Sequence, residues 1–274
     1  MYNALVNSLH ATWNRHALQA GKHVLSEKPF ASSATEASLV RDVSRTAHGQ
    51  IVEGFHYLHH PVNQRLRELV TSGALGEIKR VDIELSTPAP PDSDPRWSFE
   101  LAGGATMDLG CYVLNAARQV GRWLERAPSV VSAEAELREP NLDSGMRVEL
   151  AYEGGIQAQL HWDMDAEDRQ MVWAVIGTAG TAVVPAFAVP HMDNRILITR
   201  GNSTAEQTLG DQTSYTYQLA ALAEALQSGA EFLIDVDDSV ANARADRCGV
   251  PKSWAISARV MGGDASAPVI ADGS

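Results

Sequence analysis

A lysine lies where this sequence is best suited to hold a ligand. Residues 23–26 have the apolar character of a short buried strand, and Glu27, Lys28 and Pro29 follow it directly. Ligands of a parallel sheet bind at the carboxyl ends of its strands, and Pro29 biases Lys28 toward an extended backbone. We therefore expect the Lys28 ammonium to face a ligand, with a purely structural lysine at a strand end as the alternative.

A carboxylate and a phenol occupy the start of a predicted helix over residues 108–123. Asp108 and Tyr112 are one helical turn apart, so both side chains lie on the same helix face. A carboxylate and a phenol on one helix face make this a candidate site. The ordinary alternative is an aspartate favoured by the helix dipole, together with a half-buried tyrosine.

The elements around Lys28 alternate between strand and helix. Apolar strand patterns and helical patterns take turns at residues 2–6, 10–20, 23–26, 33–47, 50–57 and 61–73. Asn7 and Ser8 are helix-capping residue types, and Ser33 with Glu36 matches a capping box. The order β-α-β-α-β-α predicts a parallel sheet with right-handed crossovers, about half of a doubly wound domain.

From residue 78 the pattern changes to alternating apolar residues separated by glycine turns. Residues 148–152 and 156–162 flank a turn at Gly154 and Gly155, and two further strand patterns flank Gly177. Consecutive hairpins indicate a largely antiparallel sheet. The predicted fold class is therefore α/β plus α+β: part of a Rossmann-like parallel sheet, then a mostly antiparallel open-sheet domain with helices.

Composition limits the kinds of partner. The chain has 274 residues and a net charge of −12, which argues against nucleic acid or an anionic membrane surface as a partner. Cys111 and Cys248 form neither a disulfide framework nor a zinc-binding spacing, so we expect a cytoplasmic protein. We also expect neither a signal peptide nor a membrane span, because no suitable apolar run is present.

Two stretches carry a resemblance to a known family. AGKHVLSEKP, at residues 20–29, resembles the signature of the Gfo/Idh/MocA family, the glucose-fructose oxidoreductase, inositol dehydrogenase and rhizopine-catabolism group. GGATMDLGCYVLNAARQVG, at residues 103–121, resembles the glycine-rich turn and helix of that family. The resemblance implies NAD(P)-dependent oxidation of a CH–OH group of a sugar, polyol or dihydrodiol, and a homo-oligomer formed through the sheet of the second domain.

The resemblance also implies roles for the residues named above. Asp108 and Tyr112 would reach the substrate, and Lys28 would contact the nicotinamide ribose or the reacting hydroxyl. The nicotinamide carries the hydride, so the protein must manage the proton. We expect Tyr112 to accept this proton, Lys28 to favour the phenolate and Asp108 to orient its partners. A tyrosine where many relatives have histidine slightly favours NADP over NAD.

Further matches surround these residues. The expected cofactor contacts are Asn7, His10, Glu27, Lys28 and Pro29, and helix capping is the equal alternative for Asn7. The expected substrate contacts are Tyr57, His60, Arg96 and Trp97, with a surface loop as the equal alternative for the last two. Many relatives have arginine where Leu58 stands. We expect no metal, because His56, His59 and His60 cross a strand-to-helix boundary without an acidic or cysteine partner.

The resemblance and the changes of pattern along the chain imply three segments. Residues 1–77 would form the partial NAD(P)-binding domain, residues 78–244 the substrate-binding and dimerisation domain, and residues 245–274 an atypical, loose tail. The sequence contains no G-x-G-x-x-G, the fingerprint that holds a dinucleotide pyrophosphate. We therefore expect an N-terminally truncated chain, and the tail suggests an altered reading frame.

Two alternatives to an active enzyme remain open. The first is a catalytically inactive remnant that acts as a sugar-binding or dimerisation module. The second is an unfolded product of a decayed gene, because half of a parallel sheet exposes a strand edge and apolar faces. A single cooperative thermal transition would count against the second.

Overall fold

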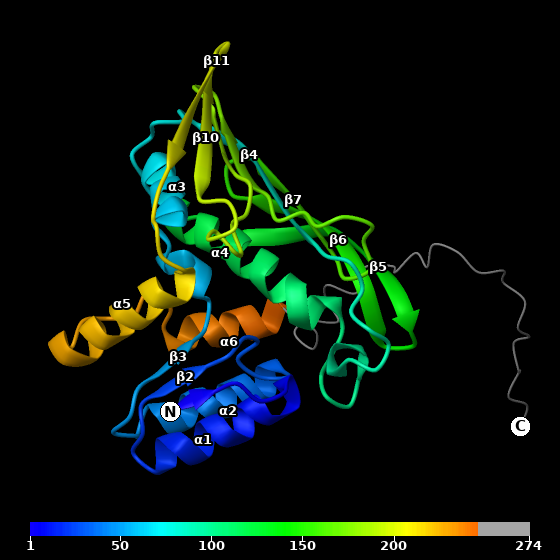
Figure 1. Ribbon diagram of the computed structural model, residues 1–274, viewed down its shortest axis with the longest axis vertical. Helices are drawn as coiled ribbons and strands as arrows, with labels where there is room; N and C mark the ends of the chain where they lie inside the picture. The colour runs from blue at the N-terminus through cyan, green and yellow to red at the C-terminus, as the bar shows by residue number, and fades with distance from the viewer. Residues whose placement is uncertain (246–274) are drawn as a thin grey trace, which may run out of the picture.

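Two sheets and the helices that pack on them make up the described part of the chain (Figure 1). The structure is a computed structural model and describes residues 1–245. The predicted tail over 245–274 therefore lies outside the described residues, apart from Ala245. Within residues 1–245, no helix combines the length and apolar character that a membrane crossing needs.

The first sheet is parallel and follows the predicted order of elements. Its strands are β1 (Tyr2–Asn3), β2 (Val24–Ser26) and β3 (Ile51–Glu53), hydrogen-bonded in that order. The connections carry α1 (His10–Gln19) and α2 (Ala34–Ser44). The three strands end at the same edge of the sheet, so the residues that follow β2 and β3 are neighbours in space.

The helix caps confirm one prediction and correct another. The Ser33 hydroxyl accepts a hydrogen bond from the Glu36 amide at 3.2 Å, and the Glu36 carboxylate accepts one from the Ser32 amide at 3.0 Å. This is the predicted capping arrangement at α2. The capping prediction for Asn7 and Ser8 is wrong, because α1 begins after Leu9 and has no side-chain cap.

The second sheet has eight strands in the order β11-β10-β9-β8-β4-β7-β6-β5. All neighbours are antiparallel except β4 and β7, which run parallel. The strands are β4 (Ile78–Ser86), β5 (Pro128–Glu139), β6 (Leu142–Tyr152), β7 (Ile156–Asp163), β8 (Trp173–Gly177), β9 (Thr181–Val184), β10 (Arg195–Arg200) and β11 (Ser203–Thr208). The predicted hairpins at Gly154 and Gly177 are confirmed.

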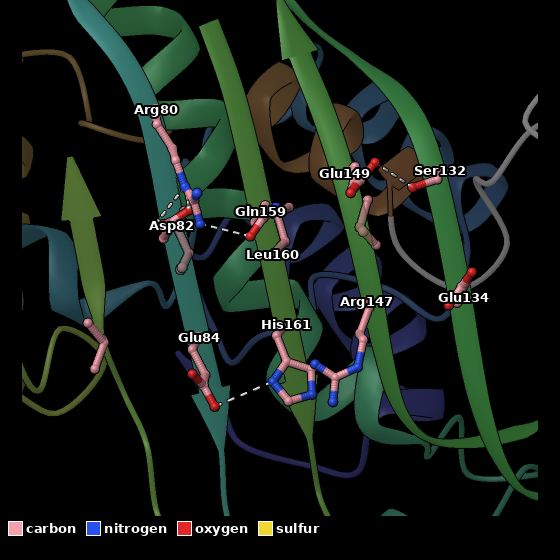
Figure 2. Close-up of a pocket in the computed structure, with 13 residues that line it drawn as sticks. Arg80, Asp82, Glu84, Ser132, Glu134, Arg147, Glu149, Gln159, Leu160 and His161 are labelled. Atoms are coloured by element: carbon pink, nitrogen blue, oxygen red, sulfur yellow. Dashed lines mark hydrogen bonds and ion pairs between the residues drawn. The ribbon is translucent and has the colours of Figure 1, made fainter. Parts of the chain in front are cut away.

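One face of the large sheet is covered and the other is open. Helices α3 (Pro61–Thr71) and α4 (Cys111–Leu124) lie on the covered face, where Trp162 and Trp173 are fully buried. Figure 2 shows the open face across β4, β7, β6 and β5, where the side chains of Arg80, His161 and Arg147 project. This alternation of buried and exposed residues is the pattern of an antiparallel sheet with one covered face.

The last helices bring the chain back to the first sheet. Helix α5 (Ser214–Ser228) packs against η2 (His56–His59), the short 3-10 turn after β3. Helix α6 (Val236–Ala245) lies between α4 and the parallel sheet, and Val240 and Ala243 join the core beneath α1 and α2. Helix α6 therefore connects the two sheets of the molecule.

Candidate active site

Lys28 meets Asp108 where the two sheets approach each other. Lys28 follows β2, and a cis peptide bond joins it to Pro29. The Lys28 ammonium lies 2.7 Å from Asp108 Oδ1 and donates to the Asp108 carbonyl oxygen at 2.8 Å. Asp108 belongs to η4 (Thr106–Gly110), a π-helical turn that runs into α4. The ion pair therefore links the carboxyl end of β2 to the start of α4.

Tyr112 completes a cluster with these two residues. The Lys28 nitrogen lies 5.0 Å from the centre of the Tyr112 ring, within the range of a cation–π contact. The Tyr112 side chain is 8% exposed. The structure thus brings together Lys28, Asp108 and Tyr112, which lie in two separate stretches of the sequence.

His56 lies beside Tyr112. From the sequence, this histidine was a candidate only for a metal ligand. His56 Nε2 is 3.1 Å from the Tyr112 hydroxyl, and His56 Nδ1 is 2.9 Å from the Ser214 hydroxyl. The signal that could have found it is positional, because His56 closely follows β3 just as Lys28 follows β2. The Ser214 contact has no such signal, since it depends on how α5 packs.

The side chains of Asp143 and Trp162 fix the turn that carries Asp108. One carboxylate oxygen of Asp143 accepts from the amide and the hydroxyl of Thr106, both at 2.7 Å. The Trp162 indole donates to the same hydroxyl at 3.0 Å. A Cβ at Gly110 would come within 2.7 Å of the Trp162 ring, so the glycine permits this close packing. The π-helical turn is thereby held against β6 and β7.

The charges at the centre of the site stabilise one another. Burial opposes the charge on Lys28, but the nearby Asp108, together with Cys111 and Tyr112, outweighs burial and raises the pKa of the ammonium above its usual value. Burial likewise opposes the charge on Asp108, but Lys28 and then Arg96 outweigh it and hold the pKa of this carboxyl below its usual range. Both groups are therefore charged at neutral pH.

The protonation state of Tyr112 differs from the expected one. Burial raises the pKa of Tyr112 well above its usual value, and the nearby Lys28 charge offsets only part of this effect. The expected phenolate is therefore not the resting form in this structure, and Tyr112 is a neutral phenol. Burial, followed by the Lys28 charge, lowers the pKa of His56 to about 3, so its ring is also neutral.

Arg96 and Trp97 separate in the structure. Arg96 pairs with Asp94 at 2.9 Å, and its Nη1 lies 3.5 Å from Asp108 Oδ2. The Arg96 side chain remains 43% exposed, so it borders the site. Trp97 is buried, donates to the Pro90 carbonyl oxygen and packs under Arg138. Trp97 thus supports the loop and does not line a pocket, contrary to the expected substrate contact.

Tyr57 and His60 also lie behind the site. Tyr57 is fully buried and donates from its hydroxyl to Asn115 Oδ1 at 2.8 Å. His60 is fully buried too, and its ring accepts from the Val62 amide at the start of α3. Neither side chain is placed to touch a substrate, because Trp173 and Phe187 enclose Tyr57, and Tyr217 of α5 packs on the His60 ring. Both residues therefore support the site from behind, contrary to the expected substrate contacts.

The expected cofactor contacts make protein contacts in this structure. Asn7 donates to the Ala102 carbonyl oxygen at 2.9 Å. The buried His10 ring lies 2.7 Å from the Pro29 carbonyl oxygen and 2.8 Å from that of Leu5. His10 therefore holds the loop after β2 in place. The Glu27 carboxylate accepts a hydrogen bond from the Tyr2 hydroxyl.

A metal site would need several His, Cys, Asp or Glu side chains close together. Within residues 1–245, no three such side chains gather in this way.

Known proteins share both parts of this fold. A family model for the oxidoreductase family with an NAD-binding Rossmann fold matches residues 3–55, and one for the GFO/IDH/MocA C-terminal domain matches residues 63–183. D-xylose 1-dehydrogenase (NADP(+)) 2 of Haloferax volcanii is 32% identical over 242 residues, which cover 88% of this chain and 73% of that enzyme. The chain belongs to the GFO/IDH/MocA oxidoreductase family. The predicted family, its fold class and its family-level chemistry, NAD(P)-dependent oxidoreduction of sugar-like substrates, are confirmed.

Other members of the GFO/IDH/MocA family extend the comparison. The dTDP-3,4-didehydro-2,6-dideoxy-alpha-D-glucose 3-reductase of Streptomyces violaceoruber is 30% identical over 230 residues, which cover 83% of this chain and 66% of that enzyme. The crystal structure of KijD10, a 3-ketoreductase from Actinomadura kijaniata in complex with NADP and TDP-benzene, superposes with a TM-score of 0.79 at 28% identity. That match covers 88% of this chain and 74% of KijD10.

The Lys28–Asp108 pair should lose its stabilising effect in acid. A carboxyl whose pKa is lower in the folded than in the unfolded state adds stability above about pH 4, and this stability disappears as the pH falls through the folded pKa. We expect Asp108→Asn to be less stable than the wild type at pH 7, and the difference to shrink in acid. Urea unfolding across this pH range measures it.

The exposed Asp42 provides a matched control. Its side chain is 58% exposed and pairs only on the surface with Arg41, so Asp42→Asn should change the free energy of unfolding little at any pH. A stability difference between wild type and Asp108→Asn that stays constant from neutral pH into acid would contradict the charge-pair account.

Proposed function

We propose that this chain carries the substrate site and the proton-handling residues of an NAD(P)-dependent oxidoreductase that acts on a CH–OH group of a sugar, polyol or dihydrodiol. The observation that carries the proposal is the meeting of Lys28, Asp108 and Tyr112 at the carboxyl end of β2. Ligands of parallel sheets bind at that edge. An ammonium, a carboxylate and a phenol in contact supply the charge and the proton that alcohol oxidation needs.

The relatives support this assignment of residues. Their names include a D-xylose dehydrogenase, deoxysugar 3-reductases and trans-1,2-dihydrobenzene-1,2-diol dehydrogenases. Solved structures of KijD10 include variants with one lysine or one tyrosine exchanged. The two exchanged positions are separated by as many residues as Lys28 and Tyr112 are here. This agreement supports a paired role for the lysine and the tyrosine.

Each residue of the cluster has a distinct part in the proposed reaction. The bound nicotinamide would supply or take up the hydride. Tyr112 exchanges the hydroxyl proton with the substrate, and Lys28 offsets the negative charge that develops on the oxygen atoms. Asp108 holds the Lys28 ammonium in place, and Arg96 borders the site on its exposed side. Domain 1–77 would hold the cofactor, and domain 78–244 the substrate.

The described residues fit the nicotinamide end of such a cofactor. The Lys28 side chain retains 16% exposure, and Lys28 and Glu27 both follow β2. Their polar groups suit ribose hydroxyls and an amide. The G-x-G-x-x-G that would hold the pyrophosphate is not part of the 274 residues. We favour NADP over NAD, because the xylose dehydrogenase and KijD10 are both named with NADP.

A titration of the 274-residue chain with NADPH and NADH, followed by nicotinamide fluorescence, tests the proposal. We expect saturable binding with a dissociation constant on the order of micromolar, tighter for NADPH, and turnover with a sugar such as D-xylose. A folded sample that binds neither nucleotide would contradict cofactor binding by this chain. Calorimetric titration with D-xylose would then test the alternative of a sugar-binding module without turnover.

We also propose that the chain forms a homo-oligomer through the open face of the large sheet. Charged side chains of both signs cover this face, and several pair with one another (Figure 2). A copy related by a two-fold axis could reuse the same pairs. Light scattering should report a dimer or larger species, and the double variant Arg80→Glu, Arg147→Glu should shift it toward the monomer. A wild-type monomer at micromolar concentration would contradict this arrangement.

A further inference from the structure

His56 lies between two hydroxyl groups from distant parts of the chain. Tyr112 lies on one side of its ring at 3.1 Å and Ser214 on the other at 2.9 Å. His56 is 1% exposed and Ser214 is fully buried. The Tyr215 ring stacks on the imidazole with 4.0 Å between ring centres. The imidazole is therefore fixed in place with a hydroxyl at each nitrogen.

A neutral imidazole carries hydrogen on one nitrogen, so two arrangements satisfy both neighbours. With the hydrogen on Nδ1, His56 donates to Ser214 and accepts from Tyr112. With the hydrogen on Nε2, His56 donates to the Tyr112 oxygen and accepts from the Ser214 hydroxyl. A serine hydroxyl serves in either role because it both donates and accepts. Both directions of this hydrogen-bonded chain are thus compatible with the observed distances.

We propose that His56, anchored by Ser214, is a positioning residue that sets whether the Tyr112 hydroxyl donates toward the substrate or is held back as a donor to the ring. The inference rests on the proposed function, in which Tyr112 exchanges the substrate proton. The arrangement with hydrogen on Nδ1 suits the resting phenol, whose proton points to His56. The arrangement with hydrogen on Nε2 suits the reacting state, because it frees the Tyr112 proton for the substrate.

The proton balance of the reaction follows from the second arrangement. During reduction of a ketone, the Tyr112 O–H bond breaks as the substrate O–H bond forms, and the hydride comes from the reduced nicotinamide. The phenolate oxygen that remains accepts a hydrogen bond from His56 Nε2. Oxidation returns the same proton from the substrate hydroxyl to that oxygen. A hydrogen bond donated to the charged form lowers its free energy, and this matters because burial disfavours a phenolate at Tyr112.

Nitrogen-15 NMR of the full chain tests the inference without any substrate. The shifts of the imidazole nitrogens report which one carries hydrogen, and His56→Phe assigns the signals. Ser214→Ala removes the partner of Nδ1, so the hydrogen should move toward Nε2. Tyr112→Phe removes the partner of Nε2, so the hydrogen should move toward Nδ1. Tyr215→Phe is the matched control, because it keeps the stacked ring.

We expect tautomer ratios to change at least about threefold, in opposite directions, in Ser214→Ala and Tyr112→Phe, since a buried N–H without a partner is costly. The ratio should stay unchanged in Tyr215→Phe, and His56 should stay neutral between about pH 5 and pH 9. A ring protonated at pH 7, or a tautomer ratio that neither variant changes, would overturn the inference.

Turnover provides the second measurement. His56→Phe should lower kcat about tenfold or more with KM changed less than about threefold, and His56→Gln should recover part of the loss because an amide both donates and accepts. Equal kcat in His56→Phe and wild type would overturn the positioning role. If the wild type turns over no sugar while the NMR result is as expected, the proposed function fails and the reversible hydrogen-bonded chain stands.

Discussion

Replacing Tyr112 by phenylalanine is expected to lower kcat by about 10²- to 10⁴-fold, the usual contribution of a positioned acid or base. The substitution removes only the hydroxyl, which lies 3.1 Å from His56. The ring remains to pack against Phe55 and under Lys28. Nucleotide affinity should therefore change by less than about threefold. Steady-state kinetics with NADPH or NADP and a sugar measures kcat, and nicotinamide fluorescence measures the affinity.

Tyr217→Phe is the control for this experiment. The Tyr217 hydroxyl accepts from the Asp211 amide at 3.2 Å, and its ring packs on His60 behind the site. Its removal should leave kcat within about twofold of the wild type, as expected for a group that takes no part in proton transfer. A Tyr112→Phe enzyme that keeps more than about a tenth of the wild-type kcat would remove Tyr112 from the proton-exchanging role.

Much of the fold could be predicted because local signals decide it. The capping residues at Ser33 and the proline at position 61 set helix starts through contacts within one turn. The glycine turns at Gly154 and Gly177 set hairpins in the same way. Such signals need only neighbouring residues, so a single sequence contains them.

The features that were missed depend on distant residues. Strand β7 pairs with β4 in parallel. The alternation of apolar residues along a strand does not indicate which other strand it pairs with. Strand β11 is polar and exposed at the sheet edge, so it lacks the apolar alternation of a strand. Helix α6 begins at Val236, where Asp235 Oδ1 caps it locally by accepting from the Asp238 amide at 2.7 Å, but the contact of the Asp238 carboxylate with Arg118 on α4 is long-range.

The candidate site also contains both kinds of feature, some predicted by local signals and some determined by distant residues. Lys28 could be found from its place after a strand, and Asp108 with Tyr112 from the resemblance of residues 103–121 to the family's glycine-rich turn and helix. The state of Tyr112 could not, because burial at the meeting of two sheets sets its pKa and no local pattern reports burial of that kind. His56 has a positional signal after β3, but its partner Ser214 has none, because α5 brings Ser214 from far along the chain.

Asp238 anchors the helix that joins the two sheets. Its carboxylate lies 2.7 Å from Arg118 Nη2 and 3.4 Å from Arg122 Nη1. It also accepts a hydrogen bond from the side-chain amide nitrogen (Nε2) of Gln119 at 3.3 Å. All three partners belong to α4, which begins just before Tyr112. The Asp238 side chain is 5% exposed, so solvent screens this cluster weakly. The cluster thereby fixes the end of the molecule that carries β2 and Lys28 against α4.

We expect Asp238→Ala to destabilise the protein by about 3–5 kcal/mol, because removing one partner of a buried ion pair leaves the other charge uncompensated. The neighbouring Asp237 is the matched control. Its side chain is 63% exposed and lies 3.5–3.7 Å from Arg45 and Arg41, so Asp237→Ala should cost less than about 1 kcal/mol. Urea unfolding of both variants at neutral pH measures the difference.

The same substitution tests whether the two sheets act together in function. Loss of Asp238 should loosen α6 between α4 and the parallel sheet, and so widen the range of positions that Lys28 takes relative to Asp108 and Tyr112. We then expect kcat to fall at temperatures well below the unfolding midpoint, where Asp237→Ala is unaffected. An Asp238→Ala protein with wild-type unfolding free energy would show that the other contacts of α6, among them Val240, Ala243 and the Asn242 hydrogen bond to the Cys111 carbonyl oxygen, suffice to hold it. Lowered stability with unchanged kcat would show that Asp238 stabilises the fold but does not align Lys28 with Asp108 and Tyr112.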